Sequence, residues 1–124
     1  MLMRLLIVML ILLGNLGAAV SGQEATEQFI PIGQSPGVSG KTSVIGQIDS
    51  FDESSRVLTI SATTGMQSIT LTESTPIWRD RSETKQSNQV GDPADLQQGR
   101  KVEVNVKEAE GQRVAEWVKV QVVE

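Results

Sequence analysis

The 124-residue sequence contains no cysteine, no histidine and no tyrosine. The absence of cysteine excludes disulfide bonds, thiolate nucleophiles and cysteine-ligated metal centres. Without histidine, acid–base and nucleophilic catalysis would rest on Asp, Glu, Lys, Ser and Thr alone. We therefore expect a protein that is not an enzyme, with no catalytic residues and no cofactor. An enzyme that uses only carboxylates is the least favoured alternative.

Aromatic residues are also scarce. Proteins that bind single-stranded nucleic acid or sugars stack several rings on one face, and this chain offers few rings for such a platform. Packing in the core or at the rim of the fold is the simpler expectation for them. The four aromatic residues are Phe29, Phe51, Trp78 and Trp117.

Positive charge is sparse, with eleven basic against fifteen acidic residues and a net charge of −4. The only loose cationic group is Arg79, Arg81 and Lys85, and Asp80 and Glu83 interrupt it. A protein that binds polyphosphate needs clustered cations, so we expect no nucleic-acid partner.

The first 22 residues have the layout of a signal peptide. One basic residue, Arg4, precedes an unbroken apolar run from Leu5 to Leu13, and small residues such as Ala19 and Ser21 follow. Nine apolar residues fall short of the roughly 20 that cross a bilayer, so we expect cleavage near Gly22 and no stable membrane span afterwards. The mature protein is predicted to be periplasmic or secreted.

Residues 23–41 read as an extended arm or linker, because two prolines and three glycines leave no sustained periodicity. Its end, "SPGVSGKT" at 35–42, misses the phosphate-binding pattern G-x-x-x-x-G-K-[ST] only at Ser35. A working loop of this kind leads into a helix, whereas the residues from Ser43 onward have the pattern of a strand. We therefore expect no nucleotide binding.

Two further near matches carry no chemistry. Ser82 and Lys85 form S-x-x-K, but the companion motifs of serine acyltransferases are absent. Asp49, Asp52 and Glu53 gather oxygen ligands that suit calcium, yet their spacing does not fit a calcium loop. We expect a solvated acidic turn and no metal site.

Residues 42–124 are predicted to form one small all-β domain. Short segments rich in β-branched residues alternate with turn residues at 43–51, 56–62, 67–73 and 75–80. One short helical turn is expected at "DPADLQQG", with Asp92 as its N-cap, Pro93 in the first position and Gly99 as its end. We expect a partly open antiparallel barrel of five or six strands, because closing a sheet protects its edges.

A hairpin over 100–123 is the clearest unit, with valines alternating with polar residues in both strands. This alternation predicts that Glu103 and Lys119 face solvent, as does Trp117 unless a bulge reverses it. Ala115 is out of phase with the last valines, which indicates a β-bulge near Glu116.

The pattern of the strands resembles that of a bacterial family of small exported domains of unknown function, over about residues 43–120. The resemblance implies a small, partly open β-barrel similar to an oligonucleotide/oligosaccharide-binding barrel, and it brings no catalytic residues. Its most specific element is A-D-L-x-x-G-x-x-V-x-V, from Ala94 to Val104.

From these features we predict a non-enzymatic binding module of the bacterial envelope whose partner is a protein or a glycan. A barrel that binds a small ligand or a cation is the alternative. The long polar loop from Arg79 to Val90 is the candidate site, because long loops on small rigid scaffolds often bind. The predicted binding residues are an apolar anchor and five forked or amide side chains: Trp78, Arg79, Arg81, Gln86, Asn88 and Gln89.

Overall fold

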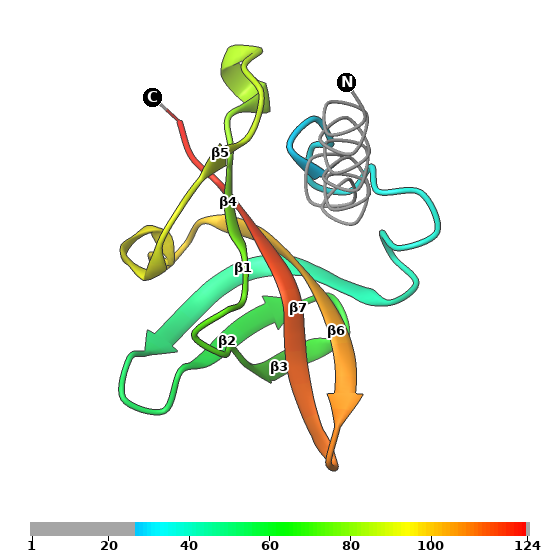
Figure 1. The fold of residues 1–124 in the computed structure, drawn as a ribbon, viewed down its shortest axis with the longest axis vertical. Helices are drawn as coiled ribbons and strands as arrows, with labels where there is room; N and C mark the ends of the chain where they lie inside the picture. The colour runs from blue at the N-terminus through cyan, green and yellow to red at the C-terminus, as the bar shows by residue number, and fades with distance from the viewer. Residues whose placement is uncertain (1–26, 124) are drawn as a thin grey trace, which may run out of the picture.

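The computed structural model describes residues 27–123, and the predicted signal peptide lies outside this range. Strands dominate the chain and coil into a small barrel (Figure 1). The strands are β1 (Ser43–Asp52), β2 (Val57–Ala62), β3 (Gly65–Thr70), β4 (Ile77–Asp80), β5 (Gln89–Val90), β6 (Lys101–Ala109) and β7 (Gln112–Gln121). The predicted all-β fold is therefore confirmed.

Five strands form the barrel, in the order β3-β2-β1-β6-β7, with β1 paired to both β2 and β6. The ring closes where β3 runs parallel to β7, through the pair Thr70 and Val114. This closure makes the barrel less open than expected. Strands β4 and β5 extend the sheet beyond the ring, with β4 parallel to β7 and β5 antiparallel to β4.

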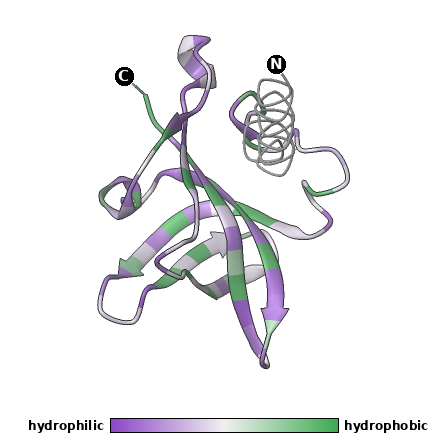
Figure 2. Cartoon of the chain, viewed as in Figure 1, coloured by the Kyte–Doolittle hydropathy of each residue, from purple (hydrophilic) through white to green (hydrophobic). Residues whose placement is uncertain are grey.

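Alternating side chains fill the interior of the barrel, and bands of apolar and polar residues run along the strands (Figure 2). Such an alternation places every second residue of a strand on the core side. The buried core consists of Ile48, Leu58, Ile60, Ile69, Leu71, Ile77, Leu96, Val102, Val104, Ala115, Val118 and Val120.

The predicted bulge in β7 is confirmed. Asn105 pairs with Trp117 and Val106 with Ala115, so Glu116 is the extra residue. The bulge restores the core-facing phase on both sides, which puts Ala115 and Val118 in the interior together.

The predicted helical turn forms as a 3-10 turn, η2 (Pro93–Asp95), in which Asp92 accepts a hydrogen bond from the Ala94 amide. A second 3-10 turn, η1 (Ser82–Thr84), was not expected. It lies inside the long polar loop, where Lys85 in the left-handed region ends it. No helix in residues 27–123 is long and apolar enough to cross a membrane.

The prediction that Glu103 and Lys119 face solvent was wrong. Both point away from the barrel core, as the alternation required, but both are fully buried. The segment before β1 covers them. It contains the described part of the predicted arm, and from here on we call residues 27–42 the arm. The arm lies across the outer face of β6 and β7, so both faces of this hairpin are buried in part.

Candidate functional site

The predicted site residues lie where the sheet extends beyond the barrel. Strand β4 places Trp78 and Arg79 opposite Val90 and Gln89 of β5. Trp78 is 9% exposed, so its ring is covered and is not an open stacking surface. We call this region the β4–β5 end.

Arg79 and Gln89 lie together on neighbouring strands. The Arg79 guanidinium donates to the Gln89 side-chain oxygen at 2.5 Å and to Asp95 Oδ1 at 3.1 Å. Asp95 is fixed in turn by the cap of η2, where it accepts from the Asp92 amide. A side chain at Gly91 would approach Arg79 and Asp95 within 2.8 Å, so glycine there lets the loop close over this cluster.

Arg81 and Gln86 lie in the loop around η1. The Arg81 guanidinium donates to the Ser87 carbonyl at 3.0 Å and so closes the loop across its base. Gln86 is exposed at the surface.

Asn88 is turned away from solvent and is 4% exposed. Its side-chain amide donates to the carbonyl oxygens of Glu27 and Ile30, at 2.9 and 3.1 Å, and its backbone amide donates to the Gln28 carbonyl. Asn88 therefore holds the first turn of the arm against the loop.

Two exposed apolar side chains flank Asn88, and the sequence prediction did not include them. Phe29, in the turn that Asn88 holds, is 70% exposed, and Val90 of β5 is 73% exposed. Val90 is a single apolar residue in a polar segment, and Phe29 begins the short apolar run Phe29-Ile30-Pro31-Ile32. The hydrogen bonds from Asn88 bring the turn that carries Phe29 to the end of the long loop, which the sequence did not indicate.

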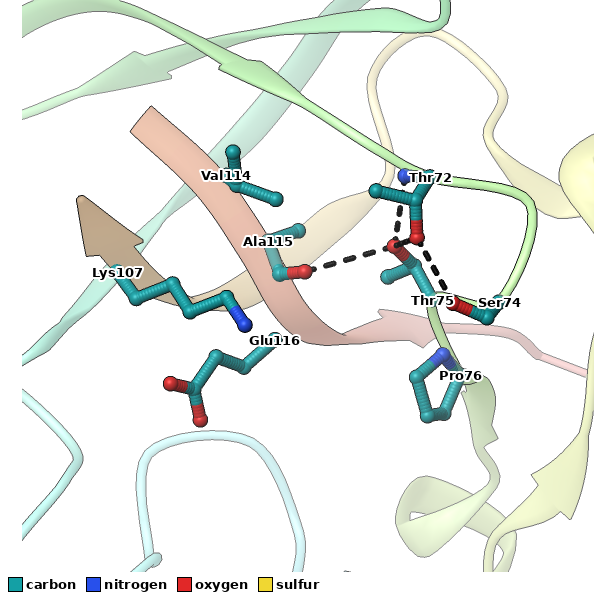
Figure 3. A pocket seen from close by; sticks show the side chains of 8 residues that line it. All are labelled: Thr72, Ser74, Thr75, Pro76, Lys107, Val114, Ala115 and Glu116. Atoms are coloured by element: carbon teal, nitrogen blue, oxygen red, sulfur yellow. Dashed lines mark hydrogen bonds between the residues drawn. The ribbon is translucent and has the colours of Figure 1, made fainter. Parts of the chain in front are cut away.

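A pocket of about 280 Å³ opens beside the bulge of β7 (Figure 3). It lies where β7 exchanges its partner β3 for β4, so the β3–β4 connection and not a strand forms one wall. Thr75 crosses this gap by donating from its hydroxyl to the Ala115 carbonyl at 3.4 Å. The lining residues are Thr72, Ser74, Thr75, Pro76, Lys107, Val114, Ala115 and Glu116.

The acidic turn after β1 is organised by its own hydrogen bonds. Asp52 Oδ1 accepts from the Ser54 hydroxyl at 2.7 Å and from the Ser54 amide at 2.9 Å. The hydrogen bond from the Ser54 hydroxyl, followed by those from the backbone amides of Ser55 and Ser54, lowers the pKa of Asp52. Within residues 27–123, no three acidic side chains gather closely enough to hold a metal ion.

The near match to a phosphate-binding loop leads into a strand, as expected. The Val38 carbonyl accepts from the amides of Lys41, Thr42 and Ser43, and Ser43 begins β1. These amides face a carbonyl of the chain itself, whereas a phosphate-binding loop needs amides that are free to bind the phosphate, backed by a helix.

Comparisons with known proteins add little to this geometry. No family model matches the chain, and no curated protein matches its sequence. Among solved structures, one titled "Crystal structure of Ag(I)CusF" is similar at a TM-score of 0.45 and 17% identity, over 63% of this chain and 93% of the other. The barrel that the sequence resemblance implied is confirmed, while membership of an exported family remains a prediction.

Proposed function

We propose that the protein is a non-enzymatic binding module of the bacterial envelope, acting in the periplasm or outside the cell, and that its partner is a protein. The observation that carries this proposal is the pair of exposed apolar side chains at the β4–β5 end, Phe29 and Val90. Aromatic and aliphatic anchors surrounded by polar groups are typical of protein-binding surfaces.

The edge of the sheet supports a protein partner over a glycan. Among the strands of residues 27–123, β5 is the last in the sheet order and pairs with β4 alone, so its outer edge can accept a further strand. A glycan site stacks sugars on several open aromatic faces, and this surface offers only Phe29, because Trp78 is buried. Gln86 and Gln89 are exposed beside the edge and offer polar contacts around it.

Photocrosslinking in the native host tests the proposal. A benzophenone amino acid replaces Val90 in one version and Met66, a residue of β3 that is 57% exposed, in the control. We expect a discrete protein adduct in the envelope fraction from position 90 only. Adducts at neither position, or the same adducts at both, would contradict the proposed surface. An adduct that survives protease digestion would identify a glycan instead.

The pocket beside the bulge supports a second candidate, a site for a small polar molecule. Its lining pairs the ammonium of Lys107 and the carboxylate of Glu116 with the hydroxyls of Thr72, Ser74 and Thr75. Opposite charges and hydroxyl groups suit a zwitterion such as an amino acid. A bound ligand should raise the melting temperature with its concentration, and Lys107→Ala should abolish that increase.

A further inference from the structure

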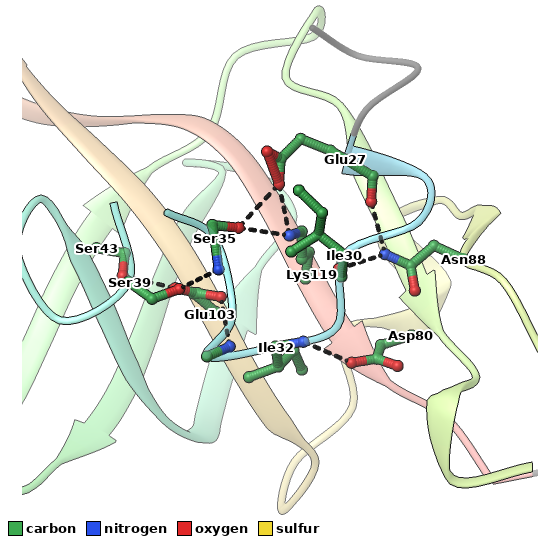
Figure 4. Close-up of polar contacts among 11 residues, drawn as sticks. Glu27, Ile30, Ile32, Ser35, Ser39, Ser43, Asp80, Asn88, Glu103 and Lys119 are labelled. Atoms are coloured by element: carbon green, nitrogen blue, oxygen red, sulfur yellow. Dashed lines mark hydrogen bonds and ion pairs between the residues drawn. The ribbon is translucent and has the colours of Figure 1, made fainter. Parts of the chain in front are cut away.

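The arm is held on the barrel by three charged side chains that point outward from it (Figure 4). We call Asp80, Glu103 and Lys119 the arm-binding face. They come from β4, β6 and β7, and each is no more than 1% exposed. Glu103 and Lys119 are direct cross-strand neighbours.

The two carboxylates of this face bind the backbone of the arm. Glu103 Oε1 accepts from the Gly33 amide at 2.9 Å, and Asp80 Oδ2 accepts from the Ile32 amide at 2.8 Å. Backbone amides are present in every peptide, so these two contacts do not depend on the side chains of the arm.

Lys119 binds a side chain of the arm. Its ammonium lies 2.5 Å from Glu27 Oε1, donates to the Ser35 hydroxyl at 2.9 Å and sits 4.5 Å from the centre of the Trp117 ring. A segment that covers the arm-binding face must therefore supply a carboxylate to Lys119 and two backbone amides, one to Glu103 and one to Asp80. The side chain of Ile32, whose amide is one of these two, is buried as well, at 8% exposure.

The polar character of the contact between the arm and the arm-binding face suits a segment that can dissociate from the barrel. Burying charged groups is costly, and an apolar seam of the same size is often as stable or more stable. A charged face is, however, well hydrated when it is uncovered, whereas an exposed apolar face is not. Glycines in the left-handed region at positions 33, 37 and 40 allow the arm to turn back towards β1.

We propose that the arm-binding face is a peptide-binding groove and that the arm is its built-in occupant. The external ligand is an extended segment of a partner protein that places a carboxylate on Lys119 and backbone amides on Glu103 and Asp80. The groove adjoins the β4–β5 end, because Phe29 belongs to the arm and Asp80 to β4. Its test substitutes neither Phe29 nor Val90, so failure of this inference and failure of the function proposed above are distinguishable. The partner can bind only while the arm is away from the groove. Its apparent affinity is therefore its intrinsic affinity multiplied by the fraction of time that the groove is uncovered.

The test uses the mature chain with two substitutions in the arm and none in the groove. Glu27→Lys sets two ammonium groups against each other, and Gly33→Pro removes the amide that Glu103 accepts and cannot adopt the φ of 85°. The probe is a fluorescent peptide of residues 27–35, EQFIPIGQS. We expect saturable binding at least about tenfold tighter than to the wild-type chain, because the competing arm is released.

Two controls make the result specific. A probe with lysine in place of its glutamate should not bind, and adding Lys119→Met to the arm variant should abolish binding of the original probe. If the arm variant melts cooperatively but does not bind the probe, or binds the two probes equally, the groove is not a peptide site. If the arm variant fails to fold, the arm is a fixed part of the domain and the proposal is wrong.

Hydrogen exchange on the wild-type chain gives an independent test. In a displaceable arm, the amides of Ile32 and Gly33 open without unfolding of the barrel. They should exchange at least about a hundredfold faster than the Val118 amide, which donates to the Pro76 carbonyl at 2.9 Å. Equal rates for the three amides would show that the arm leaves only when the whole domain unfolds.

Discussion

Glu103 and Lys119 stand opposite one another on β6 and β7, and both are fully buried although neither faces the barrel core. The arm satisfies each of them separately. Glu103 accepts from the hydroxyls of Ser39 and Ser43, at 2.6 and 2.7 Å, as well as from the Gly33 amide. The hairpin is therefore enclosed by apolar packing on one side and by hydrogen-bonded charges on the other.

Substituting Glu103→Lys should strongly destabilise the domain. The change places a second ammonium beside Lys119 and leaves three donors of the arm and β1 without their acceptor, a loss of about 3–5 kcal/mol in the free energy of unfolding. Urea denaturation followed by tryptophan fluorescence measures the loss. Glu108→Lys, at an exposed position of the same strand, is the control and should change stability by less than about 0.5 kcal/mol. Equal stabilities would show that the arm does not cover Glu103 in solution.

The burial of Glu103 shows where prediction from the sequence fails. A period of two reveals which residues share a side of a strand, and the inward valines were identified correctly from it. It does not reveal what covers the other side. The arm has no periodicity of its own and docks through single polar contacts, so nothing in its sequence indicated which face it would reach.

Local patterns, by contrast, identified features that depend on neighbouring residues. The bulge at Glu116 followed from a phase change between Ala115 and Val118, and the η2 turn followed from Asp92 and Pro93. Neither depends on a distant segment of the chain. The candidate site does depend on a distant segment, because Asn88 contacts Glu27 and Ile30, which precede it in the sequence by 61 and 58 positions.

Gly46→Ala should destabilise the barrel, because β1 pairs with β2 and β6 at this residue. A Cβ atom there would lie 2.3 Å from the Ser61 carbonyl oxygen, and both strands would have to shift. Overpacking of this kind costs about 1–3 kcal/mol. A calorimetric melt should show the loss, while Ser50→Ala, at an exposed position of β1, should not lower the melting temperature. An unchanged melt for Gly46→Ala would mean that the two strands are further apart.

The Asp52 carboxyl should titrate below its ordinary value of 3.8, because the Ser54 hydroxyl and the amides of Ser55 and Ser54 bind its charged form. A lowered pKa in the folded state stabilises the fold above about pH 3.8, and the contribution is lost as the pH falls through the folded pKa. In an NMR titration, Ser54→Ala should move the midpoint back towards 3.8. Thr63→Ala, in the next turn, should leave it unchanged. A midpoint that Ser54→Ala does not move would exclude this hydrogen bond as the cause.

Asn88→Ala should loosen the arm without unfolding the barrel. The substitution removes both donors to the carbonyls of Glu27 and Ile30, and leaving buried acceptors unpaired costs about 1–3 kcal/mol. That cost falls on the docking of the arm, so exchange of the Ile32 amide should accelerate by about tenfold or more while the melting temperature of the barrel changes little. Gln86→Ala is the matched control, because Gln86 is an exposed amide of the same loop. If both variants exchange at the wild-type rate, Asn88 does not hold the arm, and its side chain becomes available as the partner contact that the sequence predicted.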